Sequence, residues 1–232
     1  MSRSYGPWPT VIRSQFIRQI DLHSAVLRER LLPAFDNLDE EAKKIEDETY
    51  ERLYSRSSSE DPDVALLAQI AVEEAANYLV MMKKMKQAQI NLQTLGLYHL
   101  FEQQICEIHR RRVFWLGNMN ATADIKLREV KDTLLADGVA IEQLPAWSKV
   151  NELRLVANCA KHAEGDSCKQ LRQLRPDLLT PSLSGAPARL APVPVVLNPL
   201  GGENLYVSLS DFEDYVTSLK SFWLELATAL PV

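Results

Sequence analysis

The sequence predicts an all-α protein, a bundle of six to seven helices with a small β-hairpin near the C-terminus. Apolar residues recur at helical spacing through most of the chain, while proline and glycine concentrate in one tract, residues 176–203. Hydrophobic residues make up 46% of the 232, which suffices for one large core. We therefore expect a single helical domain over residues 1–232.

The helices are predicted in order from their apolar positions and from the residues that begin or end them. Residues 1–9 form a loose N-terminal arm. Asp61 can cap the third helix, and Pro62 suits its first turn. A short helix ends at Leu174, before Pro176. The longer helices are expected over residues 10–32, 39–54, 62–90, 94–114, 122–136, 147–164 and 211–229.

The tract 176–203 is expected to be a proline-rich surface loop, because it has too few apolar residues for a core of its own. VPVVL and NLYVS flank a PLGGE turn, which predicts a β-hairpin pairing residues 193–197 with 204–208. Ser210 and Glu213 have the spacing of a capping box for the last helix.

Composition excludes several classes of protein. The net charge of −5 gives no global positive field for nucleic acid, so any RNA contact needs a local basic patch. The three cysteines lack metal-ligand spacing, and the four histidines are not paired, so neither a metal nor a cofactor is expected. The N-terminus does not resemble a signal peptide, and no run of about 18 apolar residues occurs. We expect a cytoplasmic protein without membrane contact.

The stretch from residue 147 to 176 carries polar residues that packing alone does not require. Arg154, Asn158 and His162 are spaced i, i+4, i+8, which places them along one helical face, with Lys161 beside them. Gly165 predicts the end of this helix. These residues could bind or cleave an anionic substrate. Alternatively, they form a solvated face with a histidine near a helix C-terminus, where a cation is favoured.

Arg110, Arg111 and Arg112 close the predicted helix 94–114. Cations at a helix C-terminus complement the macrodipole, and three arginines could also form a small phosphate-binding patch. In the second interpretation they border the cleft that His162 and Asn158 face.

The segment ELRLVANCAKHAEG resembles the HEPN superfamily (higher eukaryote and prokaryote nucleotide-binding domains), whose commonest motif reads R-N-x-x-x-H. Asn158 and His162 match the N-x-x-x-H part. Ala157 stands where the family has its arginine, and the nearest arginine upstream is Arg154. The resemblance implies a helical bundle that acts as a homodimer and cleaves RNA without a metal, as a bacterial toxin or an antiviral defence effector.

Under this resemblance His162, Asn158 and Arg154 are the expected catalytic residues, and Lys161 with Arg110, Arg111 and Arg112 would bind RNA. Histidine suits proton transfer near neutral pH, and cations suit the anionic transition state. A neighbour-encoded protein is a further expected partner. The alternative function is a non-catalytic helical protein, an inactive HEPN relative that dimerises or binds a partner.

Overall fold

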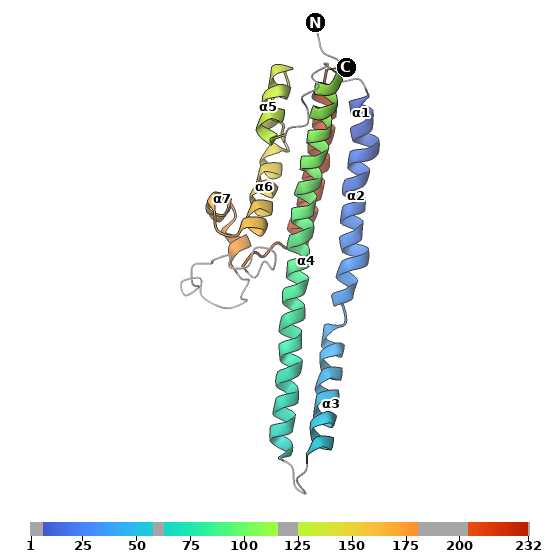
Figure 1. Ribbon diagram of the computed structural model, residues 1–232, viewed down its shortest axis with the longest axis vertical. Coiled ribbons are helices and arrows are strands. Elements are labelled where there is room, and N and C mark those ends of the chain that lie inside the picture. The colour runs from blue at the N-terminus through green and yellow to red at the C-terminus, as the bar shows by residue number, and fades with distance from the viewer. Residues whose placement is uncertain (1–6, 58–62, 116–124, 181–203, 232) are drawn as a thin grey trace.

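The computed structural model describes residues 7–57, 63–115, 125–180 and 204–231, with only the backbone for 111–115. Within these ranges the chain is all-α, as the sequence predicts, and contains no strand. Figure 1 shows α4 running the full length of the molecule, with α1 and α2 on one side and α5 and α6 on the other.

The helices have these bounds: α1 Trp8–Val11, α2 Ile17–Val26, α3 Leu38–Arg56, α4 Val64–Trp115, α5 Leu127–Ala136, α6 Trp147–His162, α7 Asp166–Leu174 and α8 Leu209–Ala229. Wider π-helical turns at Ile12–Phe16 and Leu27–Leu31 extend α1 and α2 into one long rod. Short 3-10 turns follow at Leu32–Phe35, Ile141–Gln143 and Pro176–Leu179.

Two helices predicted at 62–90 and 94–114 are one helix, α4, of 52 residues and about 78 Å. The predicted break between them is wrong because polar residues there find partners without leaving the helix. Thr94 Oγ1 donates to the Ile90 carbonyl at 2.9 Å, and Asn91 Nδ2 donates to the Leu205 carbonyl at 2.8 Å. Gly96 lets His23 approach, since a Cβ atom there would lie 3.0 Å from the imidazole.

The core of the molecule's body lies where α8 packs behind the second half of α4 (Figure 1). Trp223 and Phe222 of α8 are fully buried, and Phe101 of α4 meets the Phe222 ring edge-on with centroids 5.4 Å apart. Phe16 meets Trp223 in the same way at 5.0 Å. These aromatic contacts join the N-terminal, central and C-terminal helices in one core.

The predicted β-hairpin is not seen. Its first strand, 193–197, lies outside the described residues, and 204–208 is not a strand. Instead, the Tyr206 amide donates to the Leu178 carbonyl at 2.7 Å, and Gln87 of α4 donates to the Val207 carbonyl at 2.9 Å. The Leu178 carbonyl and a side chain of α4 therefore satisfy this segment's backbone where a second strand was expected.

The capping box of α8 lies two residues earlier than predicted. Ser208 Oγ accepts from the Asp211 amide at 3.0 Å, and the Asp211 carboxylate accepts from the Ser208 amide at 3.0 Å. Ser208 can cap because its backbone is extended, with φ −79° and ψ 164°. Ser210 lies inside the first turn of the helix instead.

A buried ionic network joins α6, the turn after α7 and the start of α8. Glu152 is only 8% exposed, and its Oε1 accepts from Arg175 at 2.6 Å, Lys149 at 2.8 Å and Tyr215 at 2.8 Å. Arg175 also donates to Asp211 at 2.7 Å. The network satisfies a carboxylate that would otherwise be buried at high cost.

Arg175 also controls the protonation of two aspartates. Its hydrogen bonds lower the pKa of Asp177 below the ordinary value. Burial would raise the pKa of Asp211, but hydrogen bonds from Arg175 and Ser208 outweigh burial and lower it. Both carboxylates are thus held in the charged form.

One stretch of α4, Val64–Arg110, is long and apolar enough to cross a membrane when judged by length and composition alone, and most of its apolar part is exposed. The core helix of a soluble protein and a signal sequence also meet these two criteria. The expectation of no membrane contact therefore stays a prediction.

Arg175→Ala should destabilise the protein by about 3 kcal/mol, because it leaves Glu152 with too few cationic partners in a buried position. Chemical unfolding followed by circular dichroism measures this. Lys220→Ala is the matched control: it removes an exposed ion pair with Asp21 and should cost less than about 1 kcal/mol. Equal losses in the two variants would show that the network contributes no more than a surface pair.

Stability should also fall in acid through Asp177 and Asp211. A carboxylate with a lowered folded pKa stabilises fully above its unfolded pKa, near 3.9, and this contribution is lost as pH falls through the folded value. The unfolding free energy measured at pH 7 and below pH 4 should drop less in Arg175→Ala than in the wild type. A parallel drop in both proteins would contradict the assignment.

Candidate functional site

The predicted residue Arg154 is partly buried against α4. Its Nε donates to Asn151 Oδ1 at 2.9 Å on the same helix. Burial raises the pKa of Tyr98 on α4, and the positive charge of Arg154 partly opposes that rise.

Asn158, one turn later, joins α6 to α7. It is partly buried, and its Nδ2 donates to Ser167 Oγ at 3.3 Å. This bond explains an asparagine inside a helix, where its side chain otherwise competes with the backbone. Ser167 also fixes how the Asn158 amide is oriented.

Lys161 and His162 are exposed in the last turn of α6. The helix ends at His162, three residues before Gly165, which has an extended φ of 178°. The chain leaves the helix through Ala163, which has φ 55° and ψ −127°. A non-glycine residue in that region costs about 1–3 kcal/mol, and such strain clusters at functional sites.

The segment 154–175 is locally basic. It has five lysines and arginines against two acidic residues, whereas the whole chain has a net charge of −5. Arg172 pairs with Glu164 at 3.0 Å, and Lys169 pairs with Asp166 at 3.1 Å. We call the surface formed by Asn158, Lys161, His162, Ala163 and Ser167 the α6–α7 corner.

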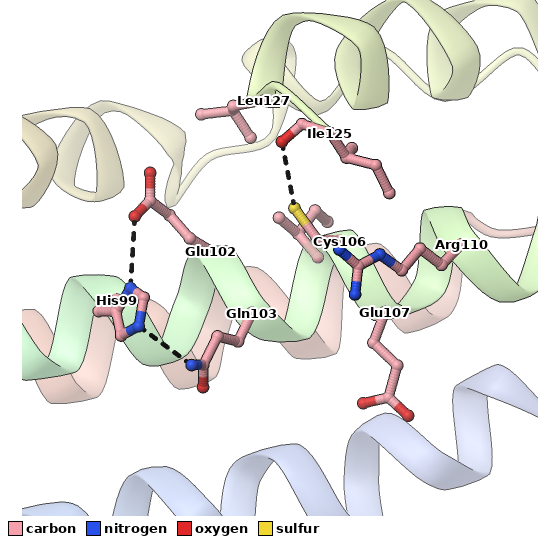
Figure 2. A pocket seen from close by; sticks show the side chains of 9 residues that line it. His99, Glu102, Gln103, Cys106, Glu107, Arg110, Ile125 and Leu127 are labelled. Atoms are coloured by element: carbon pink, nitrogen blue, oxygen red, sulfur yellow. Dashed lines mark hydrogen bonds and ion pairs between the residues drawn. The ribbon is translucent and has the colours of Figure 1, made fainter. Parts of the chain in front are cut away.

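The structure brings only some of the predicted site residues together. Asn158, Lys161 and His162 belong to the α6–α7 corner, and Arg154 lies two helical turns away from His162. Arg110 is exposed toward the far end of α4, beside the start of α5 (Figure 2). The side chains of Arg111 and Arg112 lie outside the described residues.

Arg110 borders a groove of about 750 Å³ between α4 and the start of α5 (Figure 2). Within it, His99 Nδ1 lies 3.8 Å from the Glu102 carboxylate, and the Gln103 amide lies 3.0 Å from His99 Nε2. Burial raises the pKa of the Cys106 thiol, which donates weakly to the Ile125 carbonyl at 3.9 Å. Sequence reasoning missed this cluster, although His99, Glu102 and Gln103 have the i, i+3, i+4 spacing that predicts it.

The groove and the corner differ in the chemistry that they could support. The groove brings a histidine and two carboxylates, Glu102 and Glu107, near one arginine, so it has no excess of positive charge for a phosphate. Among the described residues, no group of three or more histidine, cysteine, aspartate or glutamate side chains could hold a metal ion. The corner is the better place for an anionic substrate.

Cys159 and Cys168 are buried side by side behind the corner as free thiols. Burial and a hydrogen bond with Cys168 raise the pKa of Cys159. The Cys159 thiol is therefore held neutral, and both buried side chains act as small apolar residues that pack α7 against α6.

Comparison of the chain with protein-family models, with curated proteins and with solved structures found no match.

Proposed function

We propose that this protein is a metal-independent, RNA-cleaving, HEPN-like toxin or defence effector that acts in the cytoplasm through the α6–α7 corner. One observation carries the proposal: Lys161 and His162 are exposed together at the end of α6, directly before the strained residue Ala163. The exposed charge of Lys161 supports it, since an acidic protein needs local cations to attract RNA.

Each corner residue has a role that suits its chemistry. His162 would move the proton between the ribose 2′-hydroxyl and the leaving oxygen, and Lys161 would neutralise the phosphate in the transition state. Asn158, held by Ser167, would orient the phosphate or the imidazole. Arg154 is partly buried and donates to Asn151, so in this proposal it is a positioning residue.

A single corner provides one histidine, whereas cleavage by acid–base catalysis uses both a base and an acid. The family resemblance accounts for this with a homodimer, in which two corners complete one site. We include that homodimer in the proposed function, with RNA as the substrate and a neighbour-encoded protein as a further partner.

The second candidate is a non-catalytic helical binding protein. Arg154 and Asn158 favour it, because both side chains already have hydrogen-bond partners inside the protein, as structural residues do. Ala157, which is buried where the family has arginine, favours it too. The two candidates differ in whether loss of His162 changes any reaction.

His162→Ala should abolish cleavage of labelled RNA in the presence of EDTA, a loss of about 10²–10⁴-fold if the histidine is a general acid or base. Because His162 is exposed, the unfolding midpoint should stay unchanged. His99→Ala is the matched control, an exposed histidine on α4 outside the corner, and should retain activity. No cleavage by the wild type, or equal cleavage by all three proteins, would favour the binding protein.

Lys161→Ala should lower the cleavage rate by about 10–100-fold, the equivalent of one charge-assisted contact of about 1.5–3 kcal/mol in the transition state. Lys169→Ala is its control, because Lys169 is exposed on α7 but paired with Asp166. Single-turnover rates separate this effect from weaker RNA binding. A similar loss in both variants would indicate general attraction of RNA and not a contact made by Lys161.

A further inference from the structure

The first part of α4 forms, with α3, a two-helix projection that extends beyond the rest of the molecule (Figure 1). We call α3 together with residues 64–86 of α4 the α3–α4 hairpin. The large core of the body contains no residue of this hairpin. Each helix of the hairpin thus has one helical partner, whereas the second half of α4 contacts several.

The contact between α3 and α4 buries mostly small or polar residues. Ala71 and Ala75 of α4 are buried, and the buried residues of α3 are Leu38, Ala42 and Thr49. The Tyr78 hydroxyl donates to the Glu41 carboxylate across the pair. Such side chains bury little apolar area, so the hairpin gains limited stability from its inner contact.

The outward side of α4 is apolar where it should be polar in an isolated hairpin. Because residues advance by about 100° along a helix, the side opposite Ala71 and Ala75 carries Leu66, Ile70 and Val80. Four half-exposed apolar side chains lie within about 80° of that direction: Leu66 (52%), Ile70 (39%), Val80 (54%) and Met81 (63%). Val64, Val72 and Met85 are also exposed but point elsewhere around the helix.

The types of residue along this outward side of α4 are arranged about its middle, with opposite charges at the two ends. An acidic residue, Asp63, precedes α4, and two exposed lysines, Lys83 and Lys84, close the exposed stretch. Apolar residues lie next to both ends. Glu73 and Asn77 occupy the middle. If two copies of this surface run in opposite directions, the acidic end of each therefore faces the basic end of the other, and the polar middles face each other.

We propose that the outward side of α4 in the α3–α4 hairpin binds a second copy of this chain, with the two α4 helices antiparallel. The acidic tip of one hairpin then meets the basic base of the other. A parallel pair would bring the lysines of both copies together, and like charges in an interface are costly. This inference does not depend on RNA cleavage, and the hairpin contact is separate from the corner-to-corner contact of the proposed homodimer.

The body sets the register of this pair. Segment 205–207 lies against α4 from Gln87 onward, as the bond from Gln87 to the Val207 carbonyl shows. The exposed stretch is therefore 64–86, about 35 Å long, with its midpoint at Ala75. Full antiparallel overlap places Ile70 of one copy opposite Val80 of the other, and Glu73 opposite Asn77. The apolar pair Ile70–Val80 therefore forms twice in the interface, and the central carboxylate meets an amide donor.

A second copy fits this surface better than a lipid bilayer does. Glu73 and Glu74 lie side by side in the middle of the apolar stretch, and each charge at the centre of a membrane costs about 2.5–3.5 kcal/mol on insertion scales. Helix α3 would have to enter with seven acidic side chains. In a protein pair both glutamates stay at the polar centre or edge of the interface.

Sedimentation velocity on the full chain tests the proposal. The wild type should self-associate at micromolar concentration, and Ile70→Glu with Val80→Glu should give a species of lower mass, whether or not the α6–α7 corners also pair. Circular dichroism should be unchanged, because both positions are exposed. Leu135→Glu with Leu224→Glu is the matched control, exposed leucines of α5 and α8 that should leave the wild-type mass unchanged. A hairpin variant with the same mass as the wild type overturns the proposal.

Crosslinking tests the direction of the pair in a Cys106→Ser background. A mixture of Ile70→Cys and Val80→Cys chains should form the mixed disulfide, whereas Ile70→Cys alone should not crosslink. The reverse result would mean a parallel pair and would overturn the antiparallel arrangement. Flotation with vesicles of anionic and neutral phospholipid should leave the wild type unbound. Flotation that Ile70→Glu with Val80→Glu abolishes would assign the surface to lipid and overturn the proposal.

Discussion

The continuity of α4 is the constraint on which the rest of this structure depends. The 52 residues of α4 extend beyond the body that packs on it. The large apolar side chains of the other helices cover only its second half. The first half receives α3 alone, and α3 offers alanine and threonine where the body offers phenylalanine and tryptophan. The exposed apolar side of α4 follows directly from this mismatch in length.

The Glu152–Arg175–Asp211 network is the constraint on which the position of the α6–α7 corner depends. It fixes the helix that carries Lys161 and His162 to α8, and Asn158 fixes the same helix to Ser167. An exposed histidine on a mobile loop would lose much of its catalytic value through disorder, since productive geometry has to be held within about 0.5 Å. Here the two exposed side chains project from a helix that is held on both sides, so strain at Ala163 can persist.

The fold class was predictable because helical periodicity reports directly on a buried face. The boundaries of α3 and α8 agree with the prediction within two residues, and α5 ends at Ala136 as predicted but begins at Leu127 and not at residue 122. The break predicted between residues 90 and 94 failed because no helix breaker occurs there and Asn91 finds the Leu205 carbonyl, a partner 114 positions away that periodicity cannot reveal. The β-hairpin failed for a related reason, since Gln87 satisfies the Val207 carbonyl. The site was predictable in part. Exposure of Lys161 and His162 follows from local sequence, but i, i+4, i+8 spacing drifts by about 80° over two turns, and the packing of α4 decides where Arg154 points.

The distribution of charge makes the acidic composition compatible with an anionic substrate. Helix α3 has seven acidic and four basic side chains, so it carries −3 of the net charge of −5. Segment 154–175 has the opposite sign, and α3 lies on the other side of α4 from α6 and α7 (Figure 1). Because exposed charges are screened over about 8 Å at physiological ionic strength, a phosphate at the α6–α7 corner experiences Lys161 and its neighbours far more than it experiences α3. The net charge of −5 therefore argues against RNA binding only if it is averaged over the molecule. In this fold the acidic helix α3 and the segment 154–175 lie apart (Figure 1).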